Sequence, residues 1–417
     1  MSESAWARAA ALAIWRRLAA QGYAGWDPYD ALNARYLPAV LKNARLLRRP
    51  LTQLVKRSPV PLQPLLGVRR QVDAYTLGHV LLAAARLASA PGGVDLSGEK
   101  DIPATCARVL ADLRALARAD GDRLAWGYHF PVHTRFFSYV PPTPNLIVTA
   151  FVAKGLAAVT RAGLADCSAD LRGAVTFVLD GLPRVADSTG QCIGYVPGET
   201  TVVHNANMLA ALVLCEAAEV AGAPGGAGPR PVHGARRGRG TPWLHEALEC
   251  ARFTVARQAA DGSWPYSDKS YGSWVDGFHT GFVLEGLVRV ARTTGDLALQ
   301  AAVERGVRFY VAQLFGPDGE PKYYPHKALP FDALSAAQGV ETLHLAIGGG
   351  AARAVPGQLD WIRRHLVRPD GRVAYQVHRG YTDHREFPRW AGAPLMSALA
   401  GVTEQPSALA ADQGGAP

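Results

Sequence analysis

The chain has 417 residues, of which 48% are hydrophobic and 19% charged, and its net charge is +9. This is the composition of an ordinary soluble globular protein with a large core. No stretch of about eighteen residues is apolar enough to predict a membrane span, and arginines interrupt residues 1–21, which predict a helix and not a signal peptide. The five cysteines are widely spaced and lack a Cys-x-x-Cys pair, which fits reduced thiols in a cytoplasmic protein.

Apolar residues spaced three and four apart predict about thirteen helices, and strand-like alternation is scarce. In chain order the helices are expected at residues 5–20, 31–48, 71–90, 103–119, 145–162, 169–182, 205–221, 244–259, 278–292, 297–314, 333–347, 357–366 and 391–401. Proline and glycine lie mostly between them, as expected of residues that end helices. Residues 404–417 are small and polar, which predicts a disordered tail.

A short phrase recurs along the chain: an aromatic or Asp-Gly turn, a few polar residues, then a helix that opens on Asp, His or Asn. Its clearest copy is residues 258–266, followed by residues 274–281. The copies are marked by glycines that are 67, 68, 57 and 52 residues apart, namely Gly127, Gly194, Gly262, Gly319 and Gly371. Each unit has room for two helices, and repeats of this size form arrays or closed rings. We therefore expect an all-α, single-domain (α/α)6-type toroid over residues 1–403 rather than an open solenoid.

The long aromatic loops of this repeat precede one alternate set of helices, which we assign to the inner ring. These helices open near Asp30, Asn145, His204, Asp276, Asp332 and Trp390. If they form the inner ring, all six loops meet at one mouth, and the helix N-termini there favour anionic ligands.

The positive charge has two main sources. Residues 222–242 are rich in Gly, Pro and Arg and predict a flexible insertion. Residues 35–70 contain nine Lys or Arg and no acid. This second segment fits a solvated helix face, or a contact with an anionic substrate or a membrane surface. Nucleic-acid binding ranks last because no nucleic-acid motif accompanies the charge, and no nucleic-acid partner is expected.

Two resemblances follow from these motifs. Residues 258–264 resemble the Gln…Gly-x-Trp repeats of terpenoid cyclases and prenyltransferase-type toroids. A longer resemblance is to bacterial α/α-toroid proteins of exopolysaccharide and capsule clusters, described as squalene-cyclase-like or six-hairpin glycosidase-like. It rests on Gly25 to Asn33, Trp126-Gly127-Tyr128, Pro144-Asn145, Asn205-Ala206-Asn207, Asp261 to Trp264 and Trp274 to Gly281. The resemblance implies a toroid fold and a role in polysaccharide biosynthesis.

Asp276 and His279 are the first candidates for chemistry. They open a helix three residues apart, so their side chains share a face and form a carboxylate-oriented general base or acid. The alternative is that Asp276 only caps the helix. The neighbouring Trp264, Tyr266 and Trp274 favour function, because aromatic faces beside a carboxylate suit a sugar ring.

Similar alternatives apply to the other loops. Asn205, Asn207 and His204 can bind a substrate carboxylate and move a proton, or cap their helix, and Asp30 is expected mainly to shape a helix start. We assign catalysis to Asp276, His279, His204 and Tyr266. The substrate-binding candidates are Asp30, Trp126, Tyr128, His133, Arg135, Asn145, Asn205, Asn207, Trp264, Trp274, Tyr324, Asp332, Arg389 and Trp390. Glu341 would need a cationic partner such as Arg389.

No metal and no cofactor are expected. His129 and His133 are four residues apart, but no third ligand has a recognisable spacing. Isoprenoid chemistry lacks an Asp-x-Asp-Asp or Asp-Asp-x-x-Asp cluster, and zinc-dependent toroids need a cysteine in a loop context that is absent here.

Three functions remain. The first is a carbohydrate-active enzyme for an acidic or lipid-linked sugar, which is a hydrolase if Asp30, Asp276 and Asp332 face each other, and a lyase or epimerase if polar groups and arginines surround a uronate. The second is an isoprenoid cyclase-like or prenyltransferase-like enzyme. The third is a non-catalytic glycan-binding subunit of an assembly complex. The expected location is the cytoplasm, with peripheral contact to the membrane or to glycan-assembly proteins through residues 35–70.

Overall fold

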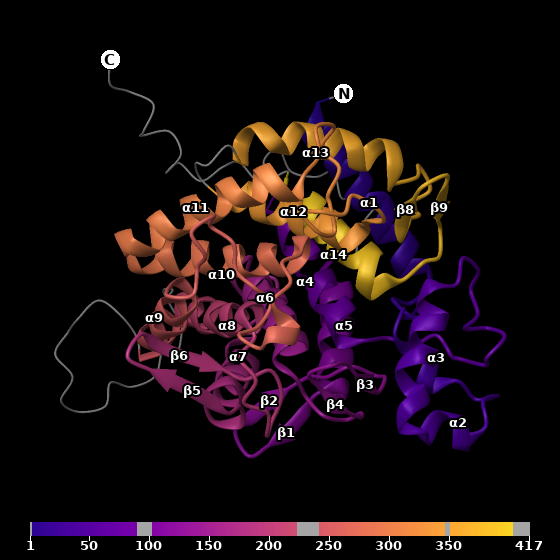
Figure 1. Cartoon of the computed structure of the whole chain (residues 1–417), viewed down its shortest axis with the longest axis horizontal. Helices are drawn as coiled ribbons and strands as arrows, with labels where there is room; N and C mark the ends of the chain where they lie inside the picture. Colours follow the sequence, from indigo (N-terminus) through magenta and orange to yellow (C-terminus); the bar gives the residue numbers. More distant parts are fainter. Residues whose placement is uncertain (1, 90–101, 223–241, 347–350, 403–417) are drawn as a thin grey trace.

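The computed structural model describes residues 2–89, 102–222, 242–346 and 351–402. Within them, six helices form an inner ring in which each helix packs against the next and the last packs against the first (Figure 1). The inner helices are α4 (Ala74–Ala88), α6 (Leu146–Arg161), α8 (His204–Gly222), α10 (Gly277–Thr294), α12 (Ala333–Leu345) and α14 (Ala393–Gly401). The expected insertion, apart from Gly222 and Pro242, and the expected tail at 404–417 lie outside the described residues.

Outer helices surround this ring. All but the first pack mainly against the inner helix that follows or precedes them in the chain, whereas the first packs mainly against α14. They are α1 (Glu3–Ala20), α5 (Ile102–Leu116), α7 (Ser168–Thr176), α9 (Pro242–Val255), α11 (Leu297–Leu314) and α13 (Ala351–His365). The all-α toroid of helical hairpins that the repeat predicts is therefore confirmed. None of the described helices is long and apolar enough to cross a membrane.

Capping side chains fix where most of the inner helices begin. Asp73, Asn145 and Asp276 each accept a hydrogen bond from the backbone amide three residues later, at 2.9, 3.0 and 3.0 Å, and Asp332 accepts one from the Leu334 amide. Each bond satisfies an amide that the first helical turn leaves unpaired. One end of the ring thus collects four caps and the positive ends of the helix dipoles.

The inner helices are buried on nearly every side. In α6, every residue from Leu146 to Val159 is buried, as is typical of a helix whose sequence is apolar all round. Helices α4 and α6 approach closely at two glycines, Gly78 and Gly155. A Cβ atom on Gly78 would lie only 2.6 Å from the carbonyl oxygen of Phe151, so a larger residue would push the two helices apart.

Small antiparallel sheets lie in the loops between helices. They pair β1 (Arg118–Asp120) with β2 (Arg123–Ala125), β3 (Val132–His133) with β4 (Ser138–Tyr139), β5 (Arg184–Asp187) with β6 (Gly190–Ile193), and β7 (Phe331–Asp332) with β8 (Gln376–His378) and β9 (Tyr381–Asp383). In the second pair Val132 lies opposite Tyr139, and this hairpin positions His133.

The helix expected over residues 31–48, and its assignment to the inner ring, are wrong. The chain instead forms a 3-10 turn at Asp30–Asn33, then α2 (Ala39–Asn43) and α3 (Arg45–Arg57), which lie beside the ring (Figure 1). Pro38 explains the break, because proline lacks an amide hydrogen and disfavours the helical conformation in the residue before it. The place in the ring belongs to α4.

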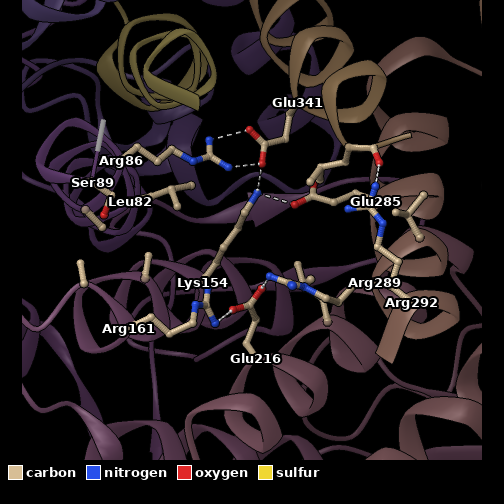
Figure 2. A pocket seen from close by; sticks show the side chains of 16 residues that line it. Leu82, Arg86, Ser89, Lys154, Arg161, Glu216, Glu285, Arg289, Arg292 and Glu341 are labelled. Atoms are coloured by element: carbon tan, nitrogen blue, oxygen red, sulfur yellow. Dashed lines mark hydrogen bonds and ion pairs between the residues drawn. The ribbon is translucent and has the colours of Figure 1, made fainter. Parts of the chain in front are cut away.

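Ion pairs join the inner helices near their C-terminal ends (Figure 2). Lys154 of α6 contacts Glu285 of α10, and its Nζ atom lies 2.7 Å from an oxygen of Glu341 in α12. Arg86 of α4 donates two hydrogen bonds of 2.7 Å to the same Glu341 carboxylate. The partner expected for Glu341, Arg389, is therefore wrong, and three helices of the ring are tied through one buried lysine.

A second group of ion pairs lies beside the first and centres on Glu216 of α8. This carboxylate is buried and pairs with Arg161 and Arg289 (Figure 2). Burial alone would raise the pKa of Glu216, but the charges of Arg289 and Arg161 outweigh it and lower the pKa to about 2. Each of these buried carboxylates has its cations within the cluster. We therefore interpret the whole cluster as structural, with ion pairs that hold the inner helices together.

Candidate functional site

A cavity of about 530 Å³ opens at the end of the ring where the inner helices begin. Its floor is built by one position of the repeat, the second residue of successive inner helices. These residues are Tyr75, Ile147, Asn205, Phe278 and Leu334. The positive ends of the helix dipoles therefore converge on this cavity, as expected from the sequence, and favour an anionic ligand.

Aromatic side chains form most of the wall. They are Tyr29, Tyr128, Phe130, Phe136, Tyr195, Tyr266, Trp274, Tyr323, Tyr324 and Trp390. Tyr266 stacks on Trp274, with ring centroids 4.8 Å apart and planes inclined by 11°. The Trp390 indole is held by its N–H, which lies 2.9 Å from Asp332. Flat aromatic faces that are held in place in this way suit the face of a sugar ring.

The charge of the cavity is strongly positive. Arg49, Arg57, Arg135 and Arg389 line it, whereas Asp276 is the one carboxylate on the lining among the described residues. Arg389 is neutralised by a buried ion pair with Asp27, a residue outside the lining. In the described part of the chain, no salt bridge occupies Arg49, Arg57 or Arg135.

Asp276 and His279 form a hydrogen-bonded pair at the start of α10. The Nδ1 atom of His279 lies 2.7 Å from Oδ2 of Asp276, while Oδ1 accepts the His279 backbone amide at 3.0 Å. The indole N–H of Trp274 donates to Oδ2 at 3.1 Å. Asp276 thus caps the helix and orients the imidazole at the same time, so the two interpretations weighed for it are compatible.

The pair directs one nitrogen of His279 away from the carboxylate. With Nδ1–H donating to Asp276, the lone pair is on Nε2, and the histidine side chain is 24% exposed while Asp276 is 2% exposed. An imidazole whose Nδ1–H is held by a buried carboxylate presents the lone pair of Nε2 as a proton acceptor. The geometry therefore provides one oriented base on the wall of a cationic, aromatic cavity.

Tyr266 and Asn205 contribute polar groups close to this base. The Tyr266 ring lies 4.7 Å from the His279 ring, and burial, helped by the charge of Asp276, raises the pKa of the phenol. Tyr266 is therefore a neutral hydroxyl that can donate a hydrogen bond. The buried Oδ1 atom of Asn205 has no hydrogen-bond partner among the described residues, although Asn205 lies on the cavity floor.

Of the predicted site residues, the structure brings eleven together in the lining of the cavity. They are Tyr128, His133, Arg135, Asn205, Tyr266, Trp274, Asp276, His279, Tyr324, Arg389 and Trp390. His133 lies in the β3–β4 hairpin with its Nδ1 atom 2.8 Å from the Ser138 hydroxyl. Burial and the nearby Arg48 lower the pKa of His133, so the imidazole of this residue is mostly neutral at pH 7.

The structure places His204 and Asn207 outside the lining. His204 is buried, and its Nε2 atom lies 2.8 Å from Asp268, which also pairs with Arg257. Asn207 bridges α8, α9 and β6, because its amide group donates to Cys250 and accepts from Ile193. Both side chains are thus engaged in packing, and neither enters the function proposed below.

Trp126, Asn145 and Trp264 also lie outside this lining. The indole N–H groups of Trp126 and Trp264 donate to backbone carbonyls of Leu113 and Thr254, at 2.7 and 2.9 Å. Asn145 serves as the cap of α6. These two tryptophans therefore anchor their loops to the outer helices α5 and α9.

Asp30 and Asp332 are fully buried and do not face Asp276 across the cavity. Asp332 caps α12 and accepts hydrogen bonds from Gln376 and Trp390. Burial, and to a smaller degree the charge of Asp27, raises the pKa of Asp30 to about 8. The Asp30 carboxyl is therefore protonated at neutral pH.

Replacing Asp30 with asparagine is expected to flatten the pH dependence of stability between about pH 4 and 8. The unfolded chain ionises Asp30 near pH 4, while the folded state keeps the proton until about pH 8. The free energy of unfolding of the native chain thus falls as pH rises through this window, and the variant lacks that loss. Urea unfolding at pH 5 and pH 8 measures the free energy of unfolding of both proteins. An equal change of this free energy between the two pH values in both proteins would contradict the raised pKa.

Several lining residues were not predicted from the sequence as site residues. Tyr29, Tyr75, Phe136, Tyr195 and Tyr323 are examples. One usable signal was present, because the second residue after four of the helix caps reaches the floor. Tyr75 follows the cap Asp73 in this way, as Phe278 follows Asp276.

A further cavity of about 340 Å³ lies at the opposite end of the ring, among the ion pairs of Figure 2. It is lined by the Lys154 and Glu216 clusters, whose carboxylates are all paired. The aromatic faces and the oriented histidine are at the other end. We therefore place the candidate site at the N-terminal ends of the inner helices.

Comparison with known proteins gives a fold but no sequence family. No family of known sequences matches the chain, and no curated protein matches it. Solved structures do match. A family 76 α-mannanase from Bacteroides thetaiotaomicron aligns with 79% of this chain and 86% of its own, with a TM-score of 0.56 and 12% identity. The chain has a six-hairpin glycosidase-like α/α toroid fold.

Two other matches are enzymes that rearrange sugars. A cellobiose 2-epimerase from Bacillus thermoamylovorans aligns over 81% of this chain and 90% of its own, with a TM-score of 0.58 and 9% identity. A D-mannose isomerase aligns over 79% and 86%, with a TM-score of 0.56 and 11% identity. At these identities the similarity establishes the fold alone.

Proposed function

We propose that this protein is a carbohydrate-active enzyme that epimerises or isomerises an anionic sugar by proton transfer. The observation that carries the proposal is the hydrogen bond between Asp276 and His279, which leaves Nε2 of His279 as an oriented base in a cavity lined by aromatic rings and arginines. The toroid fold shared with sugar epimerases and isomerases supports it.

The reaction needs only the groups on the wall. In an open-chain sugar, the hydrogen on the carbon beside the carbonyl is acidic, and Nε2 of His279 removes it. The electron pair of the C–H bond moves into an enediolate, and the imidazolium is stabilised by Asp276. Rotation of the enediolate about the single bond that joins it to the rest of the sugar presents its opposite face to the imidazolium, and return of the proton to that face gives an epimer. Return of the proton to the neighbouring carbon, with transfer of the hydroxyl proton from one enediolate oxygen to the other, gives an isomer. No other reactant is consumed.

The developing negative charge has donors close by. Tyr266 carries a neutral hydroxyl next to His279. Arg389, whose charge is balanced by Asp27, presents guanidinium N–H groups among the rings of Tyr128 and Trp390. The N-terminal ends of the inner helices add partial positive charge. Donors that are fixed before the reaction stabilise an oxyanion without reorganisation.

Hydrolysis fits the lining less well. Glycoside hydrolysis commonly uses two carboxylates on either side of the scissile bond. Among the described lining residues Asp276 is the sole carboxylate, and it already accepts hydrogen bonds from His279 and Trp274. Asp30 and Asp332 are buried elsewhere.

The sugar is expected to carry a carboxylate or phosphate. Arg49, Arg57 and Arg135 lie on the lining and are exposed, and guanidinium groups bind both anions through paired hydrogen bonds. A cytoplasmic role in bacterial polysaccharide synthesis, which the sequence resemblance implies, forms part of the proposal, since such pathways use uronates and sugar phosphates.

The test is isotope exchange in heavy water. The protein is incubated with neutral aldoses, uronic acids and phosphorylated sugars, and proton NMR follows the hydrogen beside the carbonyl. We expect that signal to disappear and an epimer or isomer to form, with the anionic sugars reacting fastest. Release of reducing sugar from glycosides without exchange would replace the proposal with hydrolysis. Saturable binding of sugars without exchange would favour a non-catalytic subunit.

A further inference from the structure

An unusual concentration of exposed apolar side chains lies beside the mouth of the cavity. Eight of the thirteen large hydrophobic side chains that are exposed among the described residues fall between residues 36 and 65: Tyr36, Val40, Leu41, Leu46, Leu47, Leu54, Val60 and Leu65. Leu46 is 87% exposed and Leu54 is 65% exposed. Scattered exposed leucines are ordinary, but such a concentration marks an interaction surface.

Helix α3 arranges part of this surface as a stripe. The adjacent Leu46 and Leu47 are followed by Pro50 and Leu54 at steps of three and four residues, so the four follow one side of the helix, and all are exposed. The adjacent side of the same helix turns to the cavity, where Arg49 and other residues join the lining. The stripe and the mouth are therefore neighbours on one element, which lies at the edge of the molecule in Figure 1.

The charge of the surface is uniform in sign. Residues 31–72 contain no Asp or Glu, and their nine cations are Arg35, Lys42, Arg45, Arg48, Arg49, Lys56, Arg57, Arg69 and Arg70. A helix with an apolar stripe flanked by Lys and Arg is suited to the interface of an anionic bilayer, where the apolar side chains enter the acyl boundary and the cations meet the headgroups.

We propose that residues 36–65 dock the protein onto an anionic membrane surface through the exposed leucines of α3. The complementarity of charge selects this occupant, because a bilayer with anionic headgroups matches both the apolar stripe and the absence of acids. An apolar protein partner or a second copy of the chain would not require a segment free of acids.

Docking in this orientation brings the mouth close to the headgroups. Arg49 and Arg57 lie on the cavity lining and on the docking helix, so a sugar tethered to a lipid through phosphate could enter with its anionic linkage against these arginines. This assignment of the substrate as lipid-linked rests on the proposed function. The docking itself does not.

The test is co-sedimentation with vesicles. The full chain is mixed with vesicles of phosphatidylcholine alone or of phosphatidylcholine with phosphatidylglycerol. We expect binding to the anionic vesicles only, and weaker binding as salt is added. A triple variant, Leu46→Ser, Leu47→Ser and Leu54→Ser, should bind about tenfold or more weakly, because it loses the apolar contribution to insertion.

A matched variant controls for the loss of exposed apolar area. Leu116→Ser, Leu297→Ser and Tyr381→Ser removes three exposed hydrophobic side chains elsewhere, and it should bind vesicles like the native chain. Circular dichroism checks that both variants are folded. Equal vesicle binding by the two variants, or no binding of the native chain to anionic vesicles, would overturn the proposal. A dimer that dissociates only in the triple variant would overturn it in favour of self-association.

The two proposals fail separately. The triple variant leaves the catalytic residues intact, so its isotope exchange with a water-soluble sugar should equal that of the native chain. If neither the native chain nor the triple variant catalyses exchange while vesicle binding is as expected, the proposed function is wrong and the docking surface is supported. If the native chain catalyses exchange but does not bind the vesicles, the proposed function is supported and the docking surface is wrong.

Discussion

Replacement of His279 by glutamine is expected to lower the turnover of the sugar by about 10²–10⁴-fold, which is the usual contribution of a positioned proton-transfer group. Glutamine has a similar size and keeps the backbone amide that Asp276 accepts, so the start of α10 should remain intact. The KM for the sugar should change little, because the aromatic wall and the arginines are untouched. Steady-state rates of isotope exchange measure the effect.

Two variants sharpen this expectation. Asparagine at position 276 caps a helix as well as aspartate does, but its NH2 group would face Nδ1 of His279 and the Trp274 indole N–H in place of Oδ2. Asp276→Asn should therefore lose turnover while the start of α10 stays helical. His245→Gln alters an exposed histidine of the outer helix α9 and should be fully active. Undiminished turnover in the His279 variant would show that another group, such as His133, carries the proton.

The elements most accessible from sequence were those set by local chemistry. The spacing of Asp276 and His279 predicts a shared helix face, and the structure shows the side chains in contact at 2.7 Å. Helix caps such as Asn145 and Asp332 could be found because they precede long apolar runs. Periodicity and capping act over a few residues, so one sequence is enough to reveal them.

The first inner helix was assigned wrongly for a related reason. Helix α4 lacks the aromatic loop phrase, whereas Asp27-Pro28, just before Asp30, has the sequence of a helix start. Local signals therefore favoured the wrong segment. What places α4 in the ring is its burial on nearly every side and its close contact with α6 at Gly78. That property depends on neighbours that are distant in the chain.

Ion pairs between residues distant in the chain could not be predicted from the sequence for the same physical reason. Arg389 binds Asp27 from 362 residues away, and Glu341 binds Arg86 from 255 residues away. Electrostatic complementarity alone allows many partners for each charge, and only the closure of the ring selects one. Residues such as Arg389 could thus be predicted as polar and near the mouth, but their ion pairs could not.

The ion pairs at the far end of the ring lead to the second large expected effect. Replacement of Lys154 by methionine should lower the free energy of unfolding by about 3–5 kcal/mol at neutral pH, because it leaves Glu285 as a buried carboxylate without its cation. Lys154 and Glu285 are 7% and 1% exposed, respectively. As a matched control, Arg364→Met removes the cation of an exposed pair with Asp360. It should lower the free energy of unfolding by at most about 0.5 kcal/mol.

The directions of the pKa shifts determine how the stabilisation from these ion pairs changes with pH. Burial alone would lower the pKa of Lys154, but Glu285 and Glu341 outweigh it and raise the pKa, whereas Arg86 and Lys154 overcome burial and lower the pKa of Glu341. The stabilisation from Lys154 is therefore present below about pH 10, and that from Glu341 is present above about pH 4.5 and lost as pH falls further. In the methionine variant, uptake of a proton by the unpaired carboxylate should shrink the deficit as pH falls.

The double variant Lys154→Met with Glu285→Gln distinguishes two causes of the instability: the loss of the ion pair itself, and the burial of a carboxylate without a cation. Glutamine keeps an acceptor for Gln338, which donates to Glu285 at 2.8 Å, and it removes the uncompensated carboxylate. We expect this variant to recover more than half of the stability lost by Lys154→Met, since replacing both members of a buried pair is far less costly than removing one. Equal instability of the single and double variants, measured by urea unfolding, would instead assign the loss to packing around the lysine chain.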